Sequence, residues 1–105
     1  LYGKTNPVLF ITEYNDRKYI LTQRYLYVLK DDNIVRYLKN ENGKYRLFKK
    51  GFILQDKKRI TLFDRNGERT GMITFKSPIL QVCYRDNILL VESTTKAFTF
   101  RLNYK

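Results

Sequence analysis

The sequence contains no histidine and no tryptophan, and it has a single cysteine, Cys83, among its 105 residues. Histidine is the commonest general base and a frequent metal ligand, so its absence excludes the Ser-His-Asp and Cys-His arrangements of catalytic sites. One cysteine without histidine also excludes the usual structural zinc sites and any intrachain disulfide bond. We therefore expect a protein that is not an enzyme and that uses no metal or other cofactor.

Other absences bear on the compartment and the class of ligand. No apolar stretch approaches the about 20 residues of a membrane-spanning helix, and the first residues do not resemble a signal peptide. The sequence has no Asn-x-Ser/Thr acceptor, and Gly43-Lys44 lacks the further residues of a phosphate-binding loop. We expect an intracellular, cytoplasmic protein with no membrane span and no small-molecule substrate. Cys83 lies in the apolar run 79–84, where we expect a small buried core residue.

Alanine, the best helix former, occurs once, at Ala97, whereas tyrosine and phenylalanine together supply sixteen residues, nine and seven respectively. Short apolar runs alternate with turn residues along the chain, and their length of about four to eight residues suits strands. Phe98, Phe100 and Leu102 alternate with other residues and would share one face of a strand. The run 88–91 is apolar throughout, which predicts a strand buried on both faces.

Turn signals separate these runs. Asn42-Gly43 and Asn66-Gly67 predict hairpins, because both dipeptides tolerate positive φ angles. The range 18–30 is ambiguous: it contains apolar residues at helical spacing, but its Tyr, Ile, Thr and Val residues favour strands. We favour two strands there, 19–23 and 25–29, or one long bent strand, with a helix as the alternative.

No linker or change of composition divides the chain, so residues 1–105 are expected to form a single all-β domain. The pattern predicts an antiparallel meander of about eight to ten short strands. Propeller-like blades, a sandwich and a barrel all remain open at this point.

The range 79–100 resembles three strands of a β-propeller blade of the WD-repeat-like kind: a strand, a tight turn, a very apolar strand, a polar turn and another strand. The range 60–67 resembles the third strand and following turn of another blade, and 25–47 resembles a further unit. The Trp-Asp and Gly-His pairs of the family are absent. Closed propellers need at least four blades, so the resemblance implies part of a larger ring, or a ring completed by association. It also implies an interaction platform and carries over no catalytic residue.

The formal net charge is +11, from 21 Lys and Arg residues against 10 Asp and Glu residues. A field of this sign attracts nucleic acid, anionic membranes or acidic proteins, although it can also serve solubility alone. The aspartates fall mostly between the apolar runs, where their side chains bond to nearby backbone amides in turns.

These observations favour a non-catalytic protein–protein interaction scaffold within a larger assembly, with a protein partner or self-association. Aromatic and arginine residues near turns are typical of interfaces. The candidate partner-binding residues are Tyr45, Arg46, Phe48, Arg65 and Arg69.

The alternative is a basic β domain that binds RNA or DNA through cations interleaved with aromatic residues. Lysines on an exposed edge strand would equally prevent unwanted strand pairing. The candidate nucleic-acid-binding residues are Lys44, Arg46, Lys49, Lys50, Lys57, Lys58 and Arg59.

Overall fold

The computed structural model describes residues 7–14, 16–40, 44–48 and 50–102. These residues form eleven strands, and no helix is found among them. Accordingly, the described part of the chain offers no apolar helix of membrane-spanning length. The antiparallel all-β meander predicted from the sequence is confirmed, with one strand more than the upper end of the expected range.

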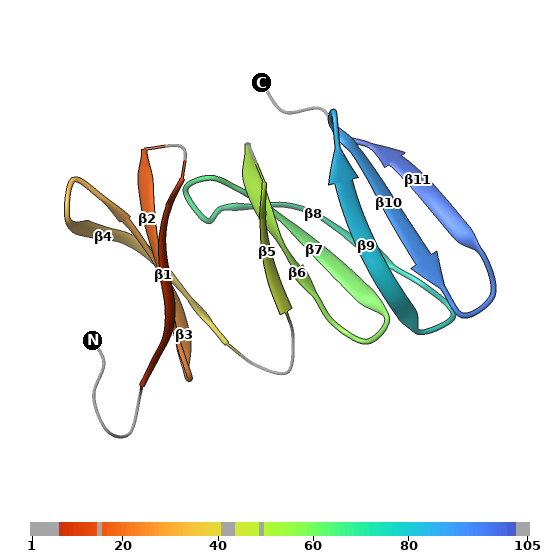
Figure 1. The fold of residues 1–105 in the computed structure, drawn as a ribbon, viewed down its shortest axis with the longest axis horizontal. Helices are drawn as coiled ribbons and strands as arrows, with labels where there is room; N and C mark the ends of the chain where they lie inside the picture. Colours follow the sequence, from red (N-terminus) through yellow and green to blue (C-terminus); the bar gives the residue numbers. More distant parts are fainter. Residues whose placement is uncertain (1–6, 15, 41–43, 49, 103–105) are drawn as a thin grey trace.

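The strands form three antiparallel sheets that follow one another along the chain and lie side by side along the longest axis of the molecule (Figure 1). The first and second sheets have four strands each, and the third has three. The first sheet consists of β1 (Val8–Tyr14), β2 (Arg17–Thr22), β3 (Tyr25–Lys30) and β4 (Asn33–Lys39). The second consists of β5 (Lys44–Phe48), β6 (Gly51–Gln55), β7 (Arg59–Asp64) and β8 (Arg69–Thr74). The third consists of β9 (Ile79–Arg85), β10 (Ile88–Ser93) and β11 (Ala97–Arg101).

The sheet boundaries test the blade units expected from the sequence. The range 79–100 coincides with the third sheet, and 60–67 covers most of β7, the third strand of the second sheet, together with its turn. The unit expected over 25–47 is wrong, because it joins β3 and β4 of the first sheet to β5 of the second. The break between these sheets falls after Lys39, because β4 is the last strand of the first sheet and β5 is the first strand of the second.

The ambiguous range 18–30 contains two strands, β2 and β3, and no helix. The hydroxyl of Thr22, at the end of β2, is fully buried. It accepts a hydrogen bond from the backbone N–H of Tyr25 and donates one to the carbonyl of Tyr25, both at 3.0 Å. These two bonds close the tight turn through Gln23 and Arg24. The alternative of a helix in this range is therefore wrong.

Two hairpins turn on residue pairs with positive φ at both central positions. Asp31 and Asp32 have φ angles of 51° and 64° between β3 and β4, and Asp86 and Asn87 have angles of 52° and 64° between β9 and β10. Asp and Asn adopt this conformation more readily than other residues with a side chain, so both pairs fit type I′ turns. The aspartates at these positions serve turn geometry, as the sequence indicates.

The predicted turn at Asn66-Gly67 lies between β7 and β8, where Gly67 has a φ of 88°. The carboxylate of Asp64 organises this turn by accepting hydrogen bonds from the backbone N–H groups of Asn66 (2.9 Å) and Glu68 (3.0 Å). The hairpin predicted at Asn42-Gly43 lies outside the described residues.

The second sheet is buried on both faces, because the first sheet covers one face and the third sheet covers the other. Phe52 and Phe63 pack with residues of the first sheet, including Tyr19, Leu26 and Val28. On the other side of the second sheet, a second apolar cluster joins it to the third sheet; its buried members are Phe48, Ile53, Ile60, Phe75, Val82, Leu89, Val91 and Leu102. Phe98 and Phe100 pack against this cluster, which confirms the face predicted for them.

Two expectations about the third sheet are wrong. Cys83 is exposed and is not a core residue. In β10, Leu89 and Val91 are fully buried, whereas Ile88 and Leu90 are 38% and 41% exposed. Cys83 and Leu90 are cross-strand partners on the face that points away from the second sheet. The described residues supply no further sheet to cover that face, so an apolar run did not make a fully buried strand.

Gly51 provides a test of the close packing between β6 and its neighbours. It is buried opposite Asp64 of β7, and a Cβ at this position would overlap the carbonyl oxygen of Phe63. We expect Gly51→Ala to lower the free energy of unfolding by about 2 kcal/mol, as overpacking against rigid backbone does. Urea denaturation measures the change.

Gly71→Ala is the matched control, because a Cβ there would meet only a side-chain carbon of Leu62, at 3.4 Å. Its free energy of unfolding should change by less than about 1 kcal/mol. Equal effects of the two substitutions would contradict the packing of β6 against β7.

Candidate interaction surfaces

The first sheet carries an apolar row on the face that points away from the second sheet. Ile11, Ile20, Tyr27 and Tyr37 are successive cross-strand partners on β1, β2, β3 and β4. Partners in register share a face of the sheet, so this row crosses all four strands. We call this surface the outer face of the first sheet.

Three tyrosines cluster on the outer face. The ring of Tyr25 lies 5.8 Å from that of Tyr27 and 5.7 Å from that of Tyr37, and Tyr27 and Tyr37 are 6.4 Å apart. Ile11 is 56% exposed and Tyr37 is 63% exposed, whereas Ile20 between them is buried. The outer face therefore presents aromatic and aliphatic side chains to the surroundings, held in place by their neighbours.

The opposite face of the same sheet carries a similar apolar row, which packs against the second sheet. Leu21, Leu26 and Leu38 are cross-strand partners one residue along from the outer row. Leu26 is fully buried, and Leu21 and Leu38 pack beside it in the apolar cluster shared with the second sheet. The first sheet thus has two apolar faces, of which the second sheet covers one.

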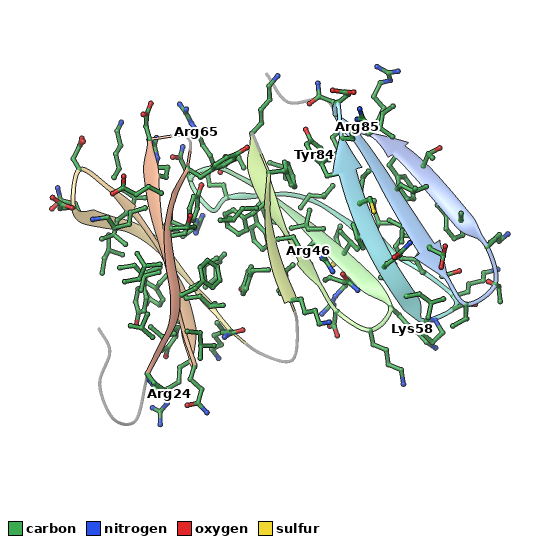
Figure 2. The ribbon with its side chains drawn as sticks, viewed as in Figure 1. Arg24, Arg46, Lys58, Arg65, Tyr84 and Arg85 are labelled. Atoms are coloured by element: carbon green, nitrogen blue, oxygen red, sulfur yellow. The ribbon has the colours of Figure 1, made fainter. Side chains whose placement is uncertain are left out.

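A second candidate surface lies between β5 and β9, the first strands of their sheets. A depression of about 440 Å³ is lined there by side chains that include Arg46, Phe48 and Tyr84. Phe48 stacks on Tyr84 with ring centroids 4.2 Å apart, and burial raises the pKa of the Tyr84 phenol. Figure 2 labels Arg46 on β5 and Tyr84 on β9; the Arg46 Nε donates to the Gln55 side chain at 3.3 Å.

The structure brings together two of the five residues predicted to bind a partner. Arg46 and Phe48 line this depression, but Phe48 is only 6% exposed and belongs to the core. Tyr45 points the other way: its ring packs near Phe52, 6.0 Å away, and its hydroxyl donates to the carbonyl of Lys39. The premise that Tyr45 and Phe48 are exposed aromatics is therefore wrong, since both stabilise contacts between sheets.

The other two predicted partner-binding residues lie at the β7–β8 turn. Arg65 lies in the turn and Arg69 begins β8, and both side chains are exposed. Arg65 lines a different depression, next to the first sheet. The predicted set is accordingly spread over separate surfaces and forms no single patch.

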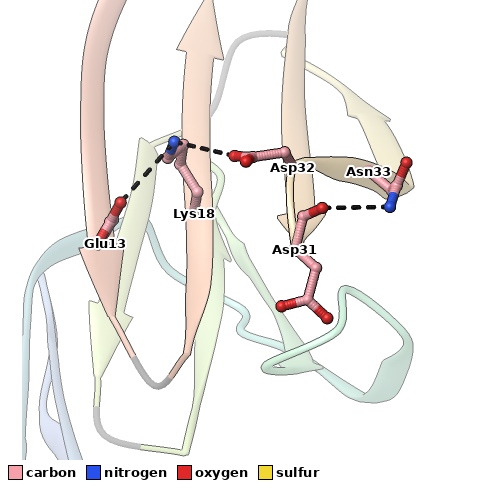
Figure 3. A network of polar contacts seen from close by, with 5 residues as sticks. All are labelled: Glu13, Lys18, Asp31, Asp32 and Asn33. Atoms are coloured by element: carbon pink, nitrogen blue, oxygen red, sulfur yellow. Dashed lines mark hydrogen bonds and ion pairs between the residues drawn. The ribbon is translucent and has the colours of Figure 1, made fainter.

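That depression, of about 680 Å³, lies at the β1–β2 and β3–β4 turns and is lined by both acids and cations. Figure 3 shows its ion pairs: the Lys18 Nζ is 3.8 Å from a Glu13 carboxylate oxygen and 3.4 Å from an Asp32 carboxylate oxygen. The Asn33 side-chain amide donates to the carbonyl of Asp31 at 3.2 Å. Glu13 and Asp32 are 76% and 88% exposed, so these pairs contribute little to stability.

The chemistry available in this depression is limited. The carboxylates of Glu13 and Asp32 face an ammonium group, and the described lining residues include no cysteine, serine or threonine as a nucleophile. Within the described residues, no group of three His, Cys, Asp or Glu side chains is placed to hold a metal ion. The arrangement suits the binding of charged groups.

Two buried side chains join this depression to the second sheet. Arg17 is 6% exposed, and its Nε donates to the Asn66 side-chain oxygen at 2.7 Å. The hydroxyl of Tyr19, a residue that is 1% exposed, donates to the carbonyl of Arg65 at 2.7 Å. Burial, the largest cause, raises the pKa of Tyr19 to about 12. Both bonds fix the β7–β8 turn against the first sheet.

The residues predicted to bind nucleic acid are divided between the two ends of the sheets. Lys44 begins β5, and Lys57, Lys58 and Arg59 lie at the β6–β7 turn, which is at the same end. Lys50 lies at the β5–β6 turn, at the opposite end, and Arg46 lies between the ends in the middle of β5. Lys49 lies outside the described residues.

The outer face of the first sheet was missed by the sequence analysis. Tyr25 and Tyr27 alternate in sequence, which hints at a shared face. Tyr25 and Tyr27 share a face with Tyr37, Ile20 and Ile11 because of the register of four strands. No local sequence pattern specifies that register.

The raised pKa of Tyr19 predicts a dependence of stability on pH. The folded-state pKa of about 12 lies above the ordinary 10.0, so this contribution to stability is complete below pH 10 and is lost as the pH rises towards 12. The loss should reach about 2 kcal/mol, and Tyr19→Phe should remove it. Urea denaturation of both proteins between pH 9 and about 12 measures the difference.

Tyr37→Phe is the control, because Tyr37 is exposed and its substitution should leave the alkaline dependence as it is in the unsubstituted protein. If Tyr19→Phe kept the full dependence, the burial of the Tyr19 phenol would be contradicted.

Comparisons with known proteins show which solved structures have a similar arrangement of sheets. No known protein family and no curated protein matches the chain. The solved structure of the β-propeller Hsv2 from Kluyveromyces marxianus has a TM-score of 0.60 at 12% identity and covers 93% of this chain and 36% of its own. Hsv2 from Kluyveromyces lactis has a TM-score of 0.59 at 8% identity and covers 93% and 34%.

The N-terminal domain of Nup159, also a propeller, has a TM-score of 0.60 at 12% identity and covers 90% of this chain and 28% of its own. The chain thus spans about a third of the length of these structures. At such low identity the likeness concerns the fold alone. It confirms the resemblance to β-propeller blades: the three sheets are arranged as consecutive blades of a β-propeller.

Proposed function

We propose that the chain is a non-catalytic interaction module, an arc of propeller blades that binds a further protein sheet through the outer face of the first sheet. One observation carries the proposal: the first sheet is apolar on both faces, and the part of the chain that the structure describes covers only one of these faces. Contiguous exposed apolar side chains of this kind mark interaction sites.

The chemistry of the outer face favours a protein sheet as its occupant. Within the chain, sheets already associate face to face through rows of aliphatic and aromatic side chains, as Leu21, Leu26 and Leu38 do. The outer row, with Ile11, Ile20 and the tyrosines, has the same construction. Tyrosine suits a protein interface because its ring is apolar and its hydroxyl can find a polar partner at the rim.

The number of sheets also supports the proposal. Three blades do not close a ring, because closed propellers have at least four. A further sheet, beyond the three that the described residues form, would cover the outer face and continue the stack. The module would then act as a scaffold within a larger assembly.

The compartment we propose is intracellular and cytoplasmic. Cys83 is exposed and is the only cysteine of the sequence, so its thiol has no partner for an intrachain disulfide. Proteins with such a cysteine usage are typical of reducing compartments.

Sedimentation velocity tests the proposal. In a solution of the chain alone, the available source of a further sheet is a second copy, so the measured mass should rise above 12.7 kDa as concentration increases. Ile11→Lys with Tyr37→Lys should hold the mass at that of the monomer, because two ammonium groups cannot be desolvated between packed sheets. Both residues are exposed, so the fold should tolerate the changes, which circular dichroism checks.

The matched control is Met72→Lys with Leu80→Lys, which changes two exposed apolar residues outside the outer face and adds the same charge. It should associate like the unsubstituted chain. A folded chain that stays monomeric at every concentration, or an equal effect of both double variants, would overturn the proposal.

A further inference from the structure

The antiparallel course of the chain gives the molecule two ends. Each strand reverses the direction of the one before, so successive connections alternate between the ends. One end holds the β2–β3, β4–β5, β6–β7, β8–β9 and β10–β11 connections, along the lower edge of Figure 1. The other end holds the remaining five connections, beginning with the β1–β2 turn.

The first of these ends is strongly basic, and we call it the basic end. Exposed cations lie in or beside each of its connections, across all three sheets; Figure 2 labels two of them, Arg24 and Lys58, near the lower edge. The exposed cations of the basic end are Arg24, Lys39, Lys44, Lys57, Lys58, Arg59, Lys76 and Lys96.

Few negative charges offset them. The described acids there are Asp56, whose carboxylate is 3.3 Å from the Arg59 guanidinium in an ion pair, and the exposed Glu92 near the end of β10. Glu41 of the β4–β5 connection lies outside the described residues. The basic end therefore keeps a large excess of positive charge.

The opposite end differs in kind. Its turns contain acids, including Asp31, Asp32 and Asp86, and several are ion-paired: Asp32 with Lys18 at 3.4 Å and Asp86 with Arg85 at 3.9 Å. Positive and negative charges are interspersed there, so their fields largely cancel at a distance. The excess charge of the chain is thus concentrated at one end.

We propose that the basic end binds the phosphodiester backbone of double-stranded nucleic acid. Its row of cations runs along the longest dimension of the molecule, 41 Å, which corresponds to about 12 base pairs at 3.4 Å each. A long anion with evenly spaced charges can meet such a row at several points, and lysine serves as a point charge for phosphate.

The composition of the basic end favours a duplex over other polyanions. Single-stranded nucleic acid is bound by stacking on exposed aromatic rings, and the described residues of these connections offer none. They also include no exposed large apolar side chain that would insert into a membrane. Their cations are mostly lysines, which lack the planar fork by which arginine recognises the carboxylates of an acidic peptide.

Binding of this kind carries no sequence information, because phosphate contacts position a protein without reading bases. Two 15-base-pair duplexes of unrelated sequence should bind alike. If about five ammonium groups meet phosphates, a plot of log K against log salt should have a slope of about −4.5.

Fluorescence anisotropy with the full chain and these duplexes provides the test. The variant Lys57→Gln, Lys58→Gln, Lys76→Gln should bind about tenfold or more weakly at 0.1 M salt, and its slope should be shallower by about 3. The control Lys30→Gln, Arg85→Gln, Arg101→Gln removes the same charge from the opposite end and should change the affinity by less than about threefold.

Each outcome decides the question. Loss confined to the basic-end variant supports the proposal. An equal loss of affinity in both variants would mean that the binding depends on net charge alone, and this would overturn the proposal. An absence of binding at 50 mM salt would overturn it as well. Polyglutamate or phosphatidylserine vesicles that displace the duplex at equal charge concentration would also overturn it, in favour of an acidic protein or a membrane. If single strands bound more tightly than duplexes, the proposal that the ligand is double-stranded would be wrong.

Discussion

Face-to-face packing of sheets is the interaction on which the rest of this structure depends. Neighbouring residues of a strand point to opposite sides, so Phe52 packs towards the first sheet while Ile53 packs towards the third. The second sheet is stable because both of its faces are covered. The same rule explains the outward faces of the first and third sheets. Each of these sheets has an apolar or mixed face that no described neighbour covers.

Alternation is local, so the sequence could predict the strands, the three-stranded unit over 79–100 and the shared face of Phe98 and Phe100. Whether a face is buried is not local. Leu89 and Leu90 are equally apolar, but Leu89 is buried and Leu90 is exposed, because the described residues cover only one side of the third sheet. The prediction that Cys83 is buried was wrong for the same reason, because Cys83 lies on the uncovered side of the third sheet. The boundary after Lys39 was missed since a connection between sheets resembles a turn within one.

The candidate surfaces were harder to predict than the fold. Arg46 and Phe48 are two residues apart on one strand, so their shared depression follows from alternation. Lys44 and Lys50 are close in sequence, but β5 runs between them and places them at opposite ends. The cluster of Tyr27 and Tyr37 requires the register between β3 and β4, which includes a bulge. Reading residues along the chain cannot supply that register.

Turn chemistry explains why charge segregates between the ends. Asp16, Asp31, Asp32 and Asp86 all have positive φ, and all lie at the end opposite the basic end. At the basic end two hairpins are closed instead by side chains at strand ends. Thr22 bonds to the backbone of Tyr25, and Ser93 bonds to that of Lys96. No described residue of the basic end has a positive φ, so its turns admit lysine and arginine, whereas the positive φ angles at the other end favour Asp and Asn.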